Sequence, residues 1–261
     1  MKDLIKVKFS KKLKGKICSL TFSKTKTNKY FVSILTEQEY ENFKKTNKSV
    51  GIDVNVKESN TFCLSDGGKI QLPKTKKEEL NKLKSLNRTL ARKKVNSRRH
   101  KQISLQIARV NEKIVNRKTD FLHKLTSQIT NNFDNIFVEN LQIKNMIKNH
   151  NLARSIQDCN WGQFFQMLEY KLLWKDKMFI KINPKNTTKT CNHCGFINKD
   201  LKFEEFWVCP NCNKEIDRDL NASVNILKKG LELISLEKSA ESLTKVKAMK
   251  RSNTRIIPCI A

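Results

Sequence analysis

Long apolar runs are missing from this sequence of 261 residues. None approaches the about 18 consecutive apolar residues that a membrane-spanning helix needs. The opening stretch, MKDLIKVKFSKK, also lacks the apolar core of a secretory signal. We therefore expect no membrane partner, and we expect a reducing, cytoplasmic location in which clustered cysteines bind metal rather than form disulfides.

Acidic residues are scarce as well. The chain has 25 Asp and Glu against 53 Lys and Arg, which gives a formal net charge of +28 at pH 7. Such an excess is larger than solubility requires and indicates a polyanionic partner. Nucleic acid is the first candidate for that partner, and a membrane surface is the weaker alternative.

Gly and Pro are absent from residues 74–130, so neither helix breaker occurs in this stretch. Apolar residues recur there at helical spacing and predict two antiparallel helices, a hairpin with its turn near residues 95–97. Residues 74–118 carry 16 Lys and Arg against 3 acids. We expect the basic side chains beside the turn to contact phosphates, although a solvated charged face is the alternative. These side chains are Arg92, Lys93, Lys94, Arg98, Arg99 and Lys101.

Four of the eight cysteines are clustered in one stretch. They form two C-x2-C pairs separated by 14 residues, namely Cys191, Cys194, Cys209 and Cys212. This spacing predicts two tight turns, here called knuckles, that bind one structural Zn²⁺ through four thiolates. We name residues 190–213 the zinc-ribbon segment. The four scattered cysteines are expected to be free thiols: Cys18, Cys63, Cys159 and Cys259.

Short strand-like stretches precede the predicted helical hairpin. Residues 1–48 contain two alternating stretches joined by a turn, and we interpret them as the remnant of a wedge-like β-barrel domain. Residues 49–73 predict three antiparallel strands with a turn at Gly67-Gly68. Asp53 interrupts the apolar run of the first of these strands, where a solvated position and a functional role are both open.

The second half of the chain alternates strands and helices. Strands are predicted at residues 136–138 and 178–182, with a helix from Leu152 between them. A last helix is predicted over residues 220–229 and is expected to end at Gly230. Residues 233–261 are weakly patterned, and we expect a partly helical or disordered tail. This order predicts an α/β fold with a mixed five-stranded, ribonuclease-H-like sheet.

Three acids fall at the ends of these predicted elements. In such a sheet the first and fourth strands can be neighbours, so Asp53 and Glu139 are expected to meet, and Asp219 can reach them from the start of the last helix. Three convergent carboxylates repel one another unless they bind cations, and oxygen ligands suit two Mg²⁺ or Mn²⁺ ions. Asp217 is the alternative to Asp219 as the third metal-binding acid. In that case Asp219 could be the N-cap of the helix.

Several stretches together resemble the TnpB (OrfB) family of insertion-sequence proteins, which are RuvC-type nucleases related to type V CRISPR effectors. The resemblance covers about residues 10 to 232 and rests on these stretches: GIDVNVKESNTFCLSDG, NRKTDFLHKLT, FVENLQIKNM, LARSIQDCNWGQFFQMLEYK, NPKNTTKTCNHCG and CPNCNKEIDRDLNASVNIL. It implies an RNA-guided DNA endonuclease of the bacterial nucleoid, with guide RNA from its own locus and a separate transposase as a further partner. It also implies that Asp53, Glu139 and Asp219 are catalytic and that the four cysteines bind zinc.

The resemblance divides the chain and leaves three functions open. It implies a RuvC nuclease domain in two parts, residues 49–189 and 214–232, around the zinc-ribbon segment. Members of the family usually carry roughly a hundred more residues before this point, and Asn55 and Ser223 stand where Gly and Ala are common. We therefore expect an amino-terminally truncated member. Its function is then a two-metal DNA endonuclease, a non-cleaving nucleic-acid-binding remnant, or a transposase that catalyses strand transfer.

Overall fold

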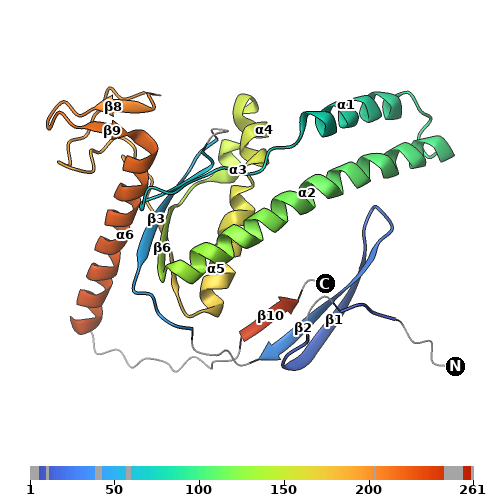
Figure 1. The fold of residues 1–261 in the computed structure, drawn as a ribbon, viewed down its shortest axis with the longest axis horizontal. Helices are drawn as coiled ribbons and strands as arrows, with labels where there is room; N and C mark the ends of the chain where they lie inside the picture. Colours follow the sequence, from blue (N-terminus) through green and yellow to red (C-terminus); the bar gives the residue numbers. More distant parts are fainter. Residues whose placement is uncertain are drawn as a thin grey trace. The chain divides into compact units, whose positions relative to one another are not determined.

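The computed structural model describes residues 6–9, 12–38, 43–56, 60–202, 204–243 and 255–259. The chain divides into two compact units (Figure 1). The first unit comprises Met1–Asn42, Thr75–Arg117 and Met249–Ala261, and the second comprises Phe43–Lys74 and Lys118–Ala248. Within the described ranges, no helix combines the length and the apolar character needed to cross a membrane.

The first unit contains a three-stranded antiparallel sheet in the order β1-β2-β10. Strands β1 (Lys16–Lys24) and β2 (Tyr30–Gln38) form the predicted hairpin, and Asn28 in their turn has φ 64°. The third strand, β10 (Arg255–Cys259), pairs with the other edge of β2. The interpretation of residues 233–261 as a tail is therefore wrong for this stretch, whereas residues 244–254 lie outside the described ranges.

The predicted basic hairpin is confirmed. Its helices are α1 (Lys77–Ala91) and α2 (Arg98–Asn132), and Asn96 in the turn has φ 65°. Arg117 on α2 donates two hydrogen bonds to the carboxylate of Glu79 on α1, at 3.0 and 2.7 Å. This bidentate pair fixes the register of the two helices and lowers the pKa of Glu79 to about 2.

The second unit is built on a five-stranded mixed sheet in the order β5-β4-β3-β6-β7. Strands β3, β4 and β5 are antiparallel neighbours, whereas β3, β6 and β7 are parallel neighbours. The predicted adjacency of the first and fourth strands is thereby confirmed. The strands are β3 (Ser49–Val54), β4 (Phe62–Leu64), β5 (Lys69–Ile70), β6 (Asn135–Glu139) and β7 (Met178–Ile182).

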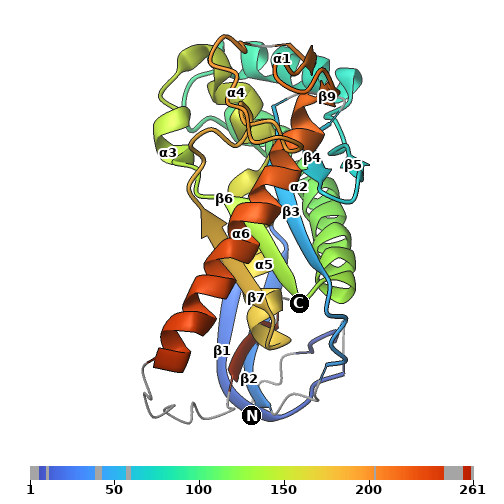
Figure 2. The same cartoon turned by 90° about the vertical axis from the view of Figure 1, so that its left-hand side faces the viewer.

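Helices cover both faces of this sheet. Successive side chains of a strand point to opposite faces, and here both faces carry apolar side chains that a helix buries. On β6, Ile136 and Val138 enter the main core with residues of α5 (Trp161–Trp174) and of the carboxyl-terminal half of α2. Phe137 points the other way and packs with Ile226 of α6 (Arg218–Leu243). Figure 2 shows α6 running along the strands on that face.

Helix α6 is longer than the sequence predicts, and the expected end at Gly230 is wrong. Gly230 lies inside the helix, where a Cβ atom would overlap with the ring of Phe137. Gly51 on β3 is a second close approach, because a Cβ there would overlap with the backbone of Ser223 and Leu227. Both glycines make room for a helix that lies unusually close to the sheet, and neither is needed as a cap.

Two other segments differ from the prediction. The single helix expected from Leu152 is broken into α4 (His150–Asp158) and α5, and Asn160 between them has φ 50°. The short helix α3 (Ile143–Met146) was not predicted. In the zinc-ribbon region, strand β8 (Phe206–Val208) pairs with an unpredicted strand, β9 (Glu215–Asp217).

A buried ion pair joins the start of β6 to the start of β7 and also holds the segment that leads into β3. Asp134 accepts hydrogen bonds from the N–H groups of Thr46 and Asn47, at 2.7 and 2.6 Å, and lies 2.9 Å from Nζ of Lys177. Burial opposes the charged form, but these partners hold the pKa of Asp134 below its ordinary value. The stabilisation is therefore present above the pKa of the unfolded chain and is lost as the pH falls through the lower folded pKa.

We expect Asp134→Asn to lower the free energy of unfolding by about 3 kcal/mol, because it leaves the Lys177 ammonium buried without its counter-ion. Urea unfolding at pH 7 measures the change. Asp120→Asn is the matched control, since Asp120 pairs with Lys124 while both side chains are more than half exposed, at 62% and 76%. Its loss should stay below about 0.5 kcal/mol. Equal losses in the two variants would contradict the assignment.

Candidate active site and metal centre

The alternation of β3 and β6 brings two acids to one face of the sheet. Asp53 shares the side of Gly51, which approaches α6, and Glu139 shares the side of Phe137, which packs on α6. The strands are parallel with Ile52 beside Val138. The next residue on each strand is Asp53 or Glu139, so both carboxyl groups lie at the carboxyl-terminal edge of the sheet on the α6 face.

Asp219 comes from the first turn of α6 and is 3% exposed. Asp53, Glu139 and Asp219 together line one pocket of about 500 Å³. Three basic side chains line the same pocket: Lys189, Lys202 and Arg218. The three acids singled out in the sequence are thus brought to one pocket, although they are far apart in the chain.

Asp217 has a different place from Asp219. Its Oδ1 accepts hydrogen bonds from the N–H groups of Asp219 and Leu220, at 3.0 and 3.1 Å, so Asp217 caps α6. Its Oδ2 lies 2.5 Å from Nζ of Lys69. Burial opposes its charged form, yet the bond from Lys69 and those N–H groups lower the pKa of Asp217. The cap belongs to Asp217, which leaves the Asp219 carboxylate to the pocket.

The pocket acids are electrostatically strained. Burial, followed by repulsion from Glu139 and Asp219, raises the pKa of Asp53 well above its ordinary value. Burial also raises the pKa of Glu139, against a hydrogen bond from Thr187. A divalent cation would relieve both effects, and an oxygen-only donor set suits Mg²⁺ or Mn²⁺. Among the described residues, however, only the cysteines form a group tight enough to share one ion, so the acids line the pocket without forming so tight a cluster.

Three uncharged side chains contact these acids and were not predicted as site residues. Asn55 donates from Nδ2 to Asp53 at 3.3 Å, and Asn60 donates from Nδ2 to Asp219 at 3.3 Å. The hydroxyl of Thr187 donates to Oε1 of Glu139. Of these three residues, only Asn55 could have been considered from the sequence, because it lies directly after the first strand. Nothing in the local pattern marks Asn60 or Thr187.

The two knuckles have the same backbone geometry. In each, the N–H of the residue after the second cysteine bonds the carbonyl of the first cysteine, from Gly195 at 2.9 Å and from Asn213 at 2.8 Å. These two residues have φ 78° and 54°, in the left-handed region. Asn213 therefore occupies in the second knuckle the position that Gly195 has in the first.

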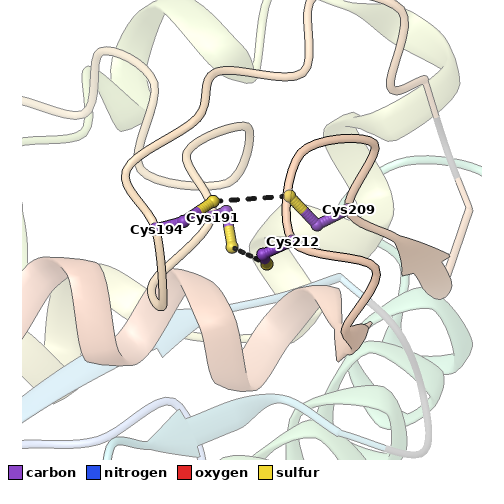
Figure 3. Close-up of side chains that lie close together, drawn as sticks. All are labelled: Cys191, Cys194, Cys209 and Cys212. Atoms are coloured by element: carbon purple, nitrogen blue, oxygen red, sulfur yellow. Dashed lines mark hydrogen bonds between the residues drawn. The ribbon is translucent and has the colours of Figure 1, made fainter.

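The four sulfurs meet between the knuckles (Figure 3). Sγ of Cys191 lies 3.8 Å from Sγ of Cys212, and Sγ of Cys194 lies 3.6 Å from Sγ of Cys209. All four lie within 4.8 Å of one another. A tetrahedron with Zn–S bonds of about 2.3 Å has edges of about 3.8 Å, so the sulfurs are spaced as zinc requires.

The surroundings of two of these thiols affect their protonation in opposite ways. A hydrogen bond from Asn211 and the N–H of Phe196 lower the pKa of Cys194 to about 6. The pKa of Cys212 is raised to about 12, because burial and the neighbouring sulfurs outweigh the N–H of Lys214. A bound dication would favour the thiolate form of all four cysteines, because thiolates are the ligands of zinc.

Helix α6 holds the segment that leads into the first knuckle. Asn221 donates from Nδ2 to the carbonyl of Thr190 at 2.8 Å and accepts the N–H of Asn192 at 2.8 Å. One turn later, Asn225 donates to the carbonyls of Thr187 and Thr190, at 2.8 and 2.6 Å. Both asparagines are buried, at 1% and 6% exposure. The helix whose first turn carries the pocket acid Asp219 is therefore tied to the zinc-ribbon segment.

The predicted phosphate-contacting residues lie at the tip of the α1–α2 hairpin in the first unit. Arg92 is the C-cap of α1, and Arg98 begins α2. Five of the six side chains are exposed and Lys93 is half-buried. Within the described residues no carboxylate forms an ion pair with these six side chains, in contrast to Arg117 farther along α2. The tip thus presents an exposed basic surface.

Two family models match this chain. The model described as "Probable transposase" (OrfB_IS605) matches residues 32–150, and the model described as "Cas12f1-like, TNB domain" matches residues 161–226. The first covers the sheet strands with Asp53 and Glu139 and the basic hairpin. The second covers the four cysteines and Asp219.

Curated proteins with similar sequences are named for one activity. A "Putative RNA-guided DNA endonuclease" of Streptomyces pristinaespiralis is 34% identical over 217 residues, which span 82% of this chain and 53% of that protein. "Putative RNA-guided DNA endonuclease InsQ" of Escherichia coli is 27% identical over 269 residues, spanning 97% of this chain and 65% of that one. The chain thus spans between half and two thirds of the length of these relatives.

Part of the chain can be aligned with chains of known structure. A chain of the Cas12f1–sgRNA–target DNA complex aligns with a TM-score of 0.47 and 21% identity, over 72% of this chain and 51% of that one.

Proposed function

This chain belongs to the TnpB (OrfB) family of insertion-sequence proteins, and on that premise we propose that it is an RNA-guided DNA endonuclease. The observation that carries the proposal is the single pocket lined by Asp53, Glu139 and Asp219. In this proposal residues 49–189 and 214–232 form a RuvC-type, ribonuclease-H-like nuclease domain, and its sheet is the five-stranded sheet of the second unit. Residues 1–48 belong to a wedge-like β-barrel domain.

The three acids would hold two Mg²⁺ or Mn²⁺ ions. Bound there, such ions activate a water molecule and stabilise the leaving oxygen of a phosphodiester. The chain's own part is to fix the three carboxyl groups in one pocket, where bound cations would favour their charged form. Arg218, with Nε 3.6 Å from Asp219, limits the repulsion between the acids. The four cysteines would hold one structural Zn²⁺ that fixes the approach to α6.

The basic hairpin would bind the nucleic acids. Its exposed Lys and Arg side chains would contact phosphates of the target DNA or of a guide RNA from the same locus, without reading bases. A separate transposase is a further partner for an insertion-sequence protein. We place the protein in the bacterial cytoplasm, at the nucleoid.

A cleavage assay tests the proposal. The chain is co-expressed with RNA from its own locus and purified, and a DNA library is then incubated with it in Mg²⁺ or in EDTA. We expect cuts that need both Mg²⁺ and the RNA and that disappear in Glu139→Gln. This variant keeps the size and hydrogen-bonding capacity of the side chain but removes its charge. Equal results for the natural chain and Glu139→Gln would refute the endonuclease proposal.

A second candidate function is nucleic-acid binding without cleavage. The formal net charge of +28 favours this function, because electrostatic binding of nucleic acid does not require an intact catalytic site. Salt-sensitive binding of RNA or DNA with no Mg²⁺-dependent cut would support this function. Strand transfer by a transposase, the third candidate, would instead yield joined DNA ends in the same assay.

A further inference from the structure

The carboxylate of Glu139 is held by a residue outside the strand that carries it. Thr187, which is 1% exposed, donates its hydroxyl proton to Oε1 of Glu139. The same hydroxyl lies 2.9 Å from the carbonyl of Pro184. A hydroxyl has one proton, and a charged carboxylate accepts a stronger hydrogen bond than a carbonyl. Donation to Glu139 is therefore the favoured arrangement.

The backbone of Thr187 is fixed in turn by α6. Its carbonyl accepts the hydrogen bond from Asn225 at 2.8 Å, and Asn225 also holds the carbonyl of Thr190 at 2.6 Å. Thr187 thus connects Glu139 at the end of β6 with α6, whose first turn carries Asp219. The two side chains that make this connection, Thr187 and Asn225, are both buried.

We propose that Thr187 is a positioning residue for Glu139 and that Asn225 fixes Thr187 for this task. The inference rests on the proposed function, because it assigns Thr187 to the metal-binding carboxylate. The last torsion of a glutamate has broad wells, so without the hydroxyl the carboxylate rotates more freely. Removing an outer partner of a metal ligand commonly weakens metal affinity by about 10- to 100-fold.

Binding of Mn²⁺ to the zinc-loaded chain, without RNA or DNA, tests this role. Isothermal titration or the electron paramagnetic resonance signal of free Mn²⁺ gives the affinity. Thr187→Val removes the hydroxyl at nearly constant shape, and we expect about tenfold weaker Mn²⁺ binding. Thr187→Ser restores the hydroxyl and should bind within about twofold of the natural chain. In cleavage, Thr187→Val should need more Mg²⁺ but approach the natural rate at saturation.

The controls separate this inference from the proposed function. If the natural chain binds Mn²⁺ no more tightly than Glu139→Gln, the proposed metal site fails, whatever Thr187→Val does. If the natural chain binds Mn²⁺ and Thr187→Val matches it, the positioning role is overturned while the metal site stands. A lower melting temperature with unchanged Mn²⁺ affinity also overturns it, because Thr187 would then be merely structural. Thr187→Ala is the second variant if Thr187→Val does not fold.

Discussion

Asp219→Asn is expected to reduce Mg²⁺-dependent DNA cleavage at least about a thousandfold, which corresponds to about 4 kcal/mol of lost transition-state stabilisation. Asp219 is buried at 3% exposure and lines the pocket with Asp53 and Glu139. The substitution keeps the shape of the side chain but removes one of three negative charges. Because the proposed ions are held by carboxylate charge, the remaining pair cannot hold both. Initial rates at saturating Mg²⁺ measure the loss.

Asp217→Asn is the matched control, two residues away in the sequence. Asn caps a helix about as well as Asp, so the start of α6 should be preserved. The lost ion pair involves Lys69, whose side chain is 41% exposed, and such a pair contributes at most about 1 kcal/mol. We expect cleavage within about threefold of the natural chain. A larger loss in Asp217→Asn than in Asp219→Asn would reverse their assigned roles.

The sheet could be predicted because its strands carry strong local signals. Val50 and Ile52 alternate with Gly51 and Asp53, and the apolar run at residues 136–138 is short and bounded, so strand type follows from the sequence. The position of Glu139 directly after such a run places it at a strand end. Two parallel strands then bring their carboxyl ends to one edge, which is why Asp53 and Glu139 could be paired before any coordinates were known.

The features that escaped prediction depend on contacts between distant residues. Gly230 signals a helix end by local rules, but its place inside α6 is set by the ring of Phe137, which is far away in the chain. Strand β10 has a weak local pattern, and pairing with β2 decides its structure. Such tertiary contacts override local propensity, and a single sequence does not display them.

The neutral residues that hold the site in place could not be predicted for the same reason. Asn221 and Asn225 look like ordinary polar residues of a helix, yet both are buried and bond backbone carbonyls of another segment. Thr187 lies within the stretch NPKNTTKTCNHCG, but nothing in that pattern indicates a contact with Glu139. The charged residues of the site could be predicted because acids at strand ends and paired cysteines are rare. The neutral residues that orient them are common types in common places.

Cys191→Ser is expected to abolish stoichiometric zinc binding and to lower stability and cleavage together. Serine does not supply a thiolate, and the remaining three sulfurs leave the tetrahedral site incomplete. Structural zinc sites contribute on the order of 10 kcal/mol to the folding of small zinc modules, so the zinc-ribbon segment should lose its fixed structure. Zinc per chain after dialysis, measured by plasma mass spectrometry, should fall from one to near zero.

We expect the loss of structure in the zinc-ribbon segment to disturb the acid pocket through α6. Cys191 lies between Thr190 and Asn192, both of which are held by Asn221 of α6, and the first turn of α6 carries Asp219. Cys18→Ser is the matched control, because Cys18 is exposed in the first unit and lies outside the cysteine cluster. It should keep one zinc and full activity. Zinc retained at one per chain in Cys191→Ser would refute the ligand assignment. Zinc lost with cleavage unchanged would show that the zinc-ribbon segment does not support Asp219.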